Sequence, residues 1–168
     1  AYTFTPNAAA INALSANTTE TFNVTVSDGT ATTAGSYTVN LTGVNDTPSL
    51  SAVSTLTGAT EDTALTISYA ALAAAANAAD VDGDTLSFRV EAVSTGTLEK
   101  GSGSSWTAVT AGTTLVSAGD TLRWAPAANA NGTLNAFTVK AWDGALASAS
   151  AVQVTITVAA VNDAPVAA

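Results

Sequence analysis

The chain contains the same sequence pattern twice, about 115 residues apart. Residues 22–29 (FNVTVSDG) match residues 137–144 (FTVKAWDG). Each copy is followed by a short Asn-Asp-X-Pro segment, at residues 45–48 and 162–165. A pattern repeated at this spacing is typical of tandem modules, because each repeat folds as one structural unit. The chain is therefore predicted to be part of an array, joined by segments that proline stiffens.

The two copies differ in what precedes them. Phe4 and Trp124 occupy matching positions, each two residues before a proline. The second copy has a long segment before this point, residues 49–120, and the first copy has no counterpart of it. We therefore expect residues 1–48 to form the C-terminal half of one module. Residues 49–168 should form a complete module that ends in an inter-module joint.

Composition limits the classes of function. The net charge of −9 argues against a nucleic acid or an anionic membrane as partner and favours a cation. The chain has no Cys and no His, which excludes disulfides, the usual zinc and copper ligands and the usual general base. No apolar run is long enough to cross a bilayer. We therefore expect no enzymatic activity, no nucleic-acid binding and no membrane insertion.

Short runs rich in Val, Thr and Ile alternate with turns rich in Gly, Asp, Asn and Ser, which predicts an antiparallel β-sandwich. In the complete module we expect a helical turn at residues 69–76 and seven strands, at residues 50–56, 64–68, 85–93, 106–109, 121–124, 137–142 and 152–158. In the half module we expect strands at residues 2–5, 21–26 and 36–41. The predicted fold class is all-β.

The sharpest acidic cluster consists of Asp80, Asp82 and Asp84, at alternate positions around Gly83. Three carboxylates in this arrangement can converge on one calcium ion, which prefers oxygen ligands. The alternative is a solvated turn, since Asp-Gly is common in turns. An EF-hand is excluded, because its twelfth position would be Glu91, inside a predicted strand.

The expected strand order places the acidic turns at the two ends of the module. At the N-terminal end, one site would combine the loop of residues 80–84 with the turn at Asp143 and the incoming joint. At the C-terminal end, a second half-site would combine the turn of residues 61–62 with the outgoing joint and with Asn129 or Asn131. The candidate calcium ligands are Asn45, Asp46, Glu61, Asp62, Asp80, Asp82, Asp84, Asp143, Asn162 and Asp163.

Taken together, these motifs resemble the cadherin-like and VCBS-type tandem repeats of large bacterial adhesins, which are often exported by type I secretion with RTX repeats. The resemblance implies Ig-like Greek-key sandwiches, calcium between modules, and an extracellular location at the bacterial surface. The implied ligands are Glu61, Asp80, Asp82, Asp143 and the two Asn-Asp joints. The expected partners are adjacent modules, an inserted ligand-binding domain that splits a module, or a neighbouring subunit.

Three functions compete at this point. The leading one is a calcium-rigidified extender that spaces or supports a ligand-binding domain of an adhesin. A second is carbohydrate binding, with Trp106, Trp124 and Trp142 as a stacking platform, although Trp124 matches Phe4 and so indicates a shared core position. A third is a self-assembling extracellular filament, in which a strand from a neighbouring subunit completes the half module.

Overall fold

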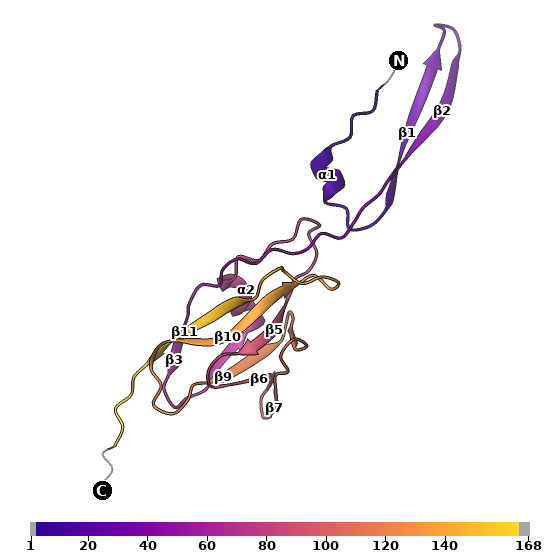
Figure 1. Cartoon of the computed structure of the whole chain (residues 1–168). Coiled ribbons are helices and arrows are strands. Elements are labelled where there is room, and N and C mark those ends of the chain that lie inside the picture. Colours follow the sequence, from indigo (N-terminus) through magenta and orange to yellow (C-terminus); the bar gives the residue numbers. More distant parts are fainter. Residues whose placement is uncertain (1–2, 165–168) are drawn as a thin grey trace. The chain divides into compact units, whose positions relative to one another are not determined.

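The computed structural model describes residues 3–164, which form two compact units. The first unit ends at Asp46 and also includes Val81–Gly83. The second comprises Thr47–Asp80 and the chain from Asp84 onward. Both units are built mainly of strands, as predicted (Figure 1).

The first unit contains one short helix and one β-hairpin. Helix α1 (Ala8–Asn12) begins after Asn7, whose side-chain oxygen accepts hydrogen bonds from the amides of Ala9 and Ala10. This cap satisfies amides that have no partner within the helix. Strands β1 (Thr18–Ser27) and β2 (Thr32–Leu41) pair antiparallel over their full lengths.

The second unit is an all-β sandwich of two sheets with one short helix. Its elements are β3 (Leu56–Thr60), β4 (Leu65–Ser68), α2 (Tyr69–Ala75), β5 (Ser87–Val93), β6 (Thr97–Ser102), β7 (Ser105–Ala108), β8 (Leu115–Val116), β9 (Thr121–Ala125), β10 (Gly132–Trp142) and β11 (Val152–Ala159). One sheet has the order β3-β11-β10-β5-β8 and the other β4-β9-β6-β7. The pairing of β3 with β11 is parallel, and the other pairings of this unit are antiparallel.

The core of the second unit lies between these sheets. On β10, Phe137, Val139 and Ala141 alternate with outward residues, and all three are fully buried. Trp124 on β9 is also fully buried, and its indole nitrogen donates to the carbonyl oxygen of Thr95 at 2.8 Å. Burial of this tryptophan therefore leaves no unsatisfied donor. The matching position of Phe4 had predicted a core role for Trp124, which is confirmed.

Most predicted strands are found within a few residues, but the first was misplaced. Residues 50–55 form no strand and make only isolated bridges, such as the one between Val53 and Ala76, whereas the strand lies at β3. Strands β6 and β8 and helix α1 were not predicted. Leu50 is nevertheless buried, so its apolar character reflects packing rather than a strand.

The strand expected at residues 2–5 does not form. Tyr2 lies outside the described residues, and residues 3–5 have no regular structure. The matching strand of the second unit, β9, is held by hydrogen bonds to β4 and β6. The described part of the first unit contains no counterpart of either strand. A strand with no neighbouring strand leaves its backbone amides and carbonyls to solvent. The strand-like sequence of residues 2–5 is therefore not sufficient for a strand to form.

Two glycines with positive φ allow a matched test of the packing at β6. Gly96 has φ +67°, and a Cβ there would lie 2.1 Å from the carbonyl oxygen of Ala125 on β9. Gly58 has φ +93° but nothing within 4 Å of such a Cβ. We expect Gly58→Ala to cost about 1–2 kcal/mol through backbone strain alone. Gly96→Ala should cost more than about 3 kcal/mol, because strain and a backbone clash combine. Urea unfolding would measure both, and equal losses would contradict the close approach.

Candidate metal centre

The loop between α2 and β5 brings three carboxylates together. Oxygen atoms of Asp80, Asp82 and Asp84 lie within 4.8 Å of one another, and all three residues are half-buried. Ligands on opposite sides of one calcium ion, each at about 2.3–2.6 Å, are about 4.6–5.2 Å apart. Gly83, with φ +77°, allows the chain to turn between the second and third aspartates. The cluster therefore fits a single calcium ion in both donor type and spacing.

Hydrogen bonds fix two of these carboxylates. The Asp84 amide donates to Oδ1 of Asp80 at 3.5 Å. The Asp46 amide donates to Oδ2 of Asp82 at 2.6 Å, which attaches the expected joint to the acidic loop. The side chain of Asn45 donates to the carbonyl oxygen of Asp46 at 3.3 Å, and its role as a calcium ligand stays a prediction.

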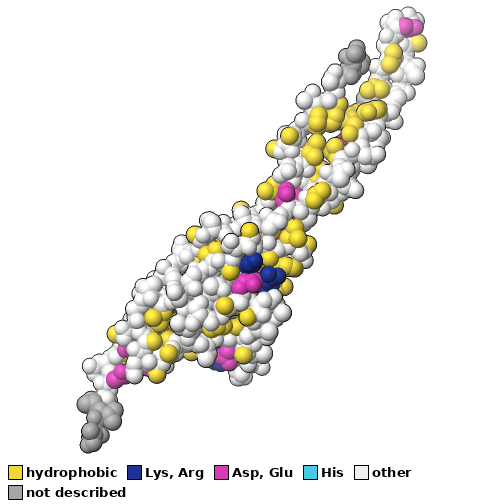
Figure 2. Space-filling view, in the orientation of Figure 1, with side chains coloured by type: hydrophobic (Ala, Val, Ile, Leu, Met, Phe, Trp, Pro, Cys, Tyr) yellow, Lys and Arg dark blue, Asp and Glu magenta, His cyan; other side chains and the backbone are white. Residues whose placement is uncertain are grey.

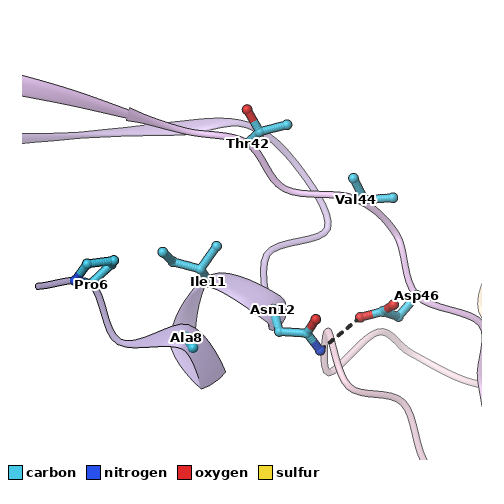
Figure 3. Close-up of a pocket in the computed structure, with 7 residues that line it drawn as sticks. All are labelled: Pro6, Ala8, Ile11, Asn12, Thr42, Val44 and Asp46. Atoms are coloured by element: carbon cyan, nitrogen blue, oxygen red, sulfur yellow. Dashed lines mark hydrogen bonds between the residues drawn. The ribbon is translucent and has the colours of Figure 1, made fainter.

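Asp46 is also held from the other side. Its Oδ2 atom accepts a hydrogen bond from the side chain of Asn12, at the end of α1, at 3.2 Å (Figure 3). This pair lies at the edge of a shallow pocket with mainly apolar walls, lined by Pro6, Ala8, Ile11, Asn12, Thr42, Val44 and Asp46. Asn12 is not among the residues predicted from the sequence, because no motif marks a helix-terminal asparagine as a partner of the joint.

Asp143 stabilises a turn, which is a role that was not predicted for it. Its Oδ1 atom accepts hydrogen bonds from the amides of Ala145 and Leu146, both at 2.6 Å, and so stabilises the turn between β10 and β11. Asp143 is not part of the described group of oxygens that lie within 4.8 Å of one another. Its role as a calcium ligand stays a prediction.

Asp28 repeats the turn of Asp143 in the first unit. Its Oδ1 atom accepts hydrogen bonds from the amides of Thr30 and Ala31, at 2.9 and 2.8 Å. The Ala31 and Thr30 amides lower the pKa of the Asp28 carboxyl from its ordinary value of 3.8. The repeated Asp-Gly thus encodes a turn in both units, because a carboxylate two residues before an amide can accept its hydrogen bond.

At the C-terminal end of the second unit, Glu61 is the central residue. It is only 4% exposed, and its Oε2 atom accepts a hydrogen bond from the Asn131 side chain at 2.9 Å. Its Oε1 atom accepts one from the Val161 amide at 2.5 Å. Neighbouring Asp62 accepts one from the Asn129 amide at 3.0 Å. The expected meeting of this turn with residues 129–131 is therefore present, and Val161, the residue just before the outgoing joint, also contacts Glu61.

The outgoing chain bonds Glu61 through the backbone of Val161, whereas the side chains of Asn162 and Asp163 were predicted. The Asn162 side chain donates to the carbonyl oxygen of Asp163 at 3.1 Å, the same local bond that Asn45 makes to Asp46. The amide of Val161 was not identified from sequence, because a backbone donor leaves no signature in residue type. Asn162 and Asp163 remain predicted ligands of a second site.

The hydrogen bonds of Glu61 make stability depend on pH. The Asn131 side chain and the Val161 amide lower the pKa of this carboxyl below its ordinary value of 4.5. Its stabilising contribution is therefore complete above pH 4.5 and is lost as the pH falls through the lower, folded-state pKa. In metal-free buffer, we expect Glu61→Gln to be less stable than the wild type at pH 7, since the single side-chain oxygen of glutamine can replace only one of the two carboxylate acceptors and its amide nitrogen cannot accept the other bond.

The difference in stability between Glu61→Gln and the wild type should shrink as the pH falls below about 4.5, because the wild-type Glu61 carboxyl then takes up a proton. Urea midpoints measured between pH 7 and pH 3 would show the two proteins converging. Glu20→Gln, on exposed strand β1, is the matched control and should run parallel to the wild type. A deficit that stays constant with pH would contradict the assigned role of Glu61.

The three tryptophans do not form one platform. Trp106 lies on β7 and Trp142 on β10, in different sheets, while Trp124 is in the core. The guanidinium of Arg123 lies 4.5 Å from the ring centre of Trp106, and that of Arg89 lies 5.2 Å from the ring centre of Trp142. Cation–π packing of this kind already occupies a face of each of these two half-buried rings. The arrangement does not favour the carbohydrate-binding hypothesis.

The sequence matches the cadherin-like domain over residues 44–159, more than half of the chain. The chain belongs to the cadherin-like domain family. The family confirms the predicted all-β sandwich, whereas the RTX and VCBS context remains an expectation. No curated protein sequence matches the chain.

Two solved structures with similarity to the cadherin-like chain are an endo-fucoidan hydrolase of glycoside hydrolase family 107 and a variant of the same enzyme. The variant is 22% identical with a TM-score of 0.37, and the enzyme is 21% identical with a TM-score of 0.35. Each alignment covers 92% of this chain but only 20% of the hydrolase chain. The cadherin-like chain thus spans about a fifth of the length of these enzymes.

Among its described residues, no helix is both long and apolar enough to cross a membrane.

Proposed function

We propose that this chain is a calcium-rigidified extender module of a bacterial surface adhesin, which spaces or supports a ligand-binding domain. The observation that carries the proposal is the group of three carboxylates at Asp80, Asp82 and Asp84, whose spacing fits one calcium ion. Cadherin-like domains generally bind calcium and are usually extracellular, which supports the same reading. The partners would be adjacent modules of the same polypeptide.

Electrostatics supports a cation at this loop. Three carboxylates within 4.8 Å of one another repel when all are ionised. A bound calcium ion, held by one oxygen from each aspartate, would replace that repulsion with attraction. The loop would then be stiffer with the ion than without it.

The hydrogen bond between Asp46 and Asp82 connects this chemistry to the joint. The Asp46 amide donates to the same carboxylate that would bind the ion. A calcium ion that orders Asp82 would therefore also hold the joint residue in place. Pro48 follows two residues later and restricts the backbone there. An ordered, proline-stiffened joint is what an extender requires.

A non-enzymatic role fits the chemistry of the chain. The sequence has no histidine to serve as a general base. The lysines at positions 100 and 140 have structural partners, since Lys100 pairs with Asp120 at 2.6 Å and Lys140 donates to the carbonyl oxygen of Ala149 at 3.0 Å. The clustered carboxylates of Asp80, Asp82 and Asp84 lie on a loop, with a spacing that fits a calcium ion. We therefore propose binding and spacing, not catalysis.

Calorimetric titration of the chelator-treated chain with calcium tests the proposal. We expect saturable binding with a Kd of about 10⁻⁴–10⁻³ M or tighter, the range of extracellular modules. Asp82→Asn should weaken binding by about tenfold or more, because a neutral amide replaces a charged ligand. Glu20→Gln, which removes the same charge from the exposed strand β1, should leave the Kd unchanged.

Asp143→Asn is the second informative variant. Weaker calcium binding would mean that the turn between β10 and β11 contributes a ligand, as the sequence predicts. An unchanged Kd would mean that the Asp143 carboxylate stabilises the turn and does not bind calcium. Absence of heat up to 10-fold above about 10⁻³ M calcium, or equal binding by wild type and Asp82→Asn, would refute the proposed calcium site.

A further inference from the structure

The hairpin of the first unit has two chemically different faces. Residues directly opposite each other in an antiparallel pair share a face. Phe22 lies opposite Tyr37 and Val24 opposite Gly35, so these residues lie on one side. The pairs that alternate with them along the register are polar and lie on the other side, Thr21 with Thr38 and Asn23 with Ser36. The hairpin is therefore amphipathic.

The apolar face of this hairpin is exposed. Four large apolar residues of the hairpin are exposed, Phe22 at 40%, Val24 at 49%, Val26 at 70% and Tyr37 at 63%, and so is Phe4 beside them at 46%. The Phe4 ring packs on that of Phe22, with ring centres 5.4 Å apart, and the two rings border a groove. Figure 2 shows hydrophobic side chains gathered along this unit. A two-stranded sheet with one such face is only marginally stable by itself.

The internal repeat identifies what normally covers these positions. Phe22, Val24 and Val26 match Phe137, Val139 and Ala141, and Phe4 matches Trp124. All four residues of the second unit are fully buried. Their core neighbours include residues from β4, β5, β6 and β8, namely Ile67, Phe88, Val90, Leu98 and Val116. The same side-chain pattern is thus covered in one unit by a segment that the described part of the other does not contain.

The edges of the hairpin lead to the same conclusion. Strand β10 pairs with β11 on one side and β5 on the other, whereas its repeat equivalent β1 pairs with β2 alone among the described strands. Strand β11 pairs with β3 on its outer edge, and β2 has no described strand in that position. An edge with unpaired amides and carbonyls is a template for strand addition.

We propose that the apolar face and outer edges of the β1–β2 hairpin bind a protein segment with the strand pattern of β3 to β8, the N-terminal half of a cadherin-like module. A strand equivalent to β5 would add beside β1, and one equivalent to β3 beside β2. Strands equivalent to β4 and β6 would cover the apolar face and pair with residues 3–5. A second copy of this chain does not fit, because its own β3–β8 segment already packs on its own β9–β11.

The proposal is independent of the calcium site, since none of the hairpin residues is a candidate ligand. To test it, an additional copy of residues 47–118 would be joined by a flexible Gly/Ser linker to the N-terminus of the full chain. The linker keeps the added segment at high effective concentration near the hairpin. Hydrogen exchange of β1 and β2 would be compared with that of the unmodified chain.

We expect exchange in β1 to slow by about tenfold or more in the extended chain, because its outer amides gain a partner. Val24→Asp, on the apolar face, should abolish this protection. Thr25→Asp places the same charge on the polar face of the same strand and should preserve it. Unchanged exchange in the extended chain would overturn the proposal. So would sedimentation of the unmodified chain as a dimer that Val24→Asp dissociates, which would make a second copy the occupant.

Discussion

Phe137→Ala should lower the free energy of unfolding of the second unit by about 3–5 kcal/mol. Phe137 is fully buried on β10, where it lies opposite Val93 of β5 and Val154 of β11. Truncation removes the apolar contact area of the ring and leaves a cavity that the flanking strands cannot close without breaking their ladders. Such a loss is a large part of the total stability of a small domain.

The internal repeat provides a matched control for this substitution. Phe22→Ala makes the same chemical change at the equivalent position of the hairpin, where the side chain is 40% exposed. All three tryptophans of the chain lie in the second unit, so denaturant unfolding followed by tryptophan fluorescence reports that unit alone. Phe22→Ala should change this transition by less than about 0.5 kcal/mol. Comparable losses from both substitutions would contradict the burial assigned to β10.

Calcium at about 100 times its Kd should raise the free energy of unfolding by about 2.7 kcal/mol, because an ion that binds only the folded state shifts the equilibrium by mass action. For a chain of this length, the increase corresponds to a rise in Tm of about 5–10 °C. Calorimetric scans with calcium and with excess chelator would measure it. The same scans would show whether the hairpin unfolds separately from the sandwich.

The charge-removing variants separate specific binding from general screening. Asp82→Asn combined with Asp84→Asn should abolish the calcium-dependent rise in Tm and should raise the Tm in chelator, since the remaining carboxylate meets less repulsion. Glu20→Gln should behave like the wild type in both buffers. A rise in Tm that persists in the double variant would place the stabilising ion elsewhere. Equal Tm values in calcium and in chelator would remove the support for a calcium-stiffened extender.

Local sequence signals located the acidic loop without the structure. The alternation of Asp80, Asp82 and Asp84 around a glycine was sufficient, because residues so close in sequence can converge without any help from the rest of the fold. The contact between Glu61 and residues 129–131 was predicted from strand order alone. Its contact with the Val161 amide depends on where the outgoing chain leaves β11.

For Asp143, by contrast, the sequence could not decide the role of the side chain. A carboxylate before a glycine fits a turn as well as a metal ligand, and only the hydrogen bonds to Ala145 and Leu146 show that the turn uses it. The misplaced first strand has a similar origin. Leu50 is apolar and buried, yet no strand is available to pair with its segment. Pairing partners are chosen among elements far apart in the chain, and residue type does not encode that choice.

The sequence by itself determined the all-β class, the modular repeat and the acidic turns, because alternation, turn residues and short-range spacing are local properties. The tertiary structure decided which copies of the repeated positions are buried. Phe22 and Phe137 belong to the same pattern, yet one is exposed and the other lies in a closed core. Burial depends on strands such as β4, β5 and β6, which lie many residues away from the repeated pattern, so only the assembled sheets distinguish a complete sandwich from an open hairpin.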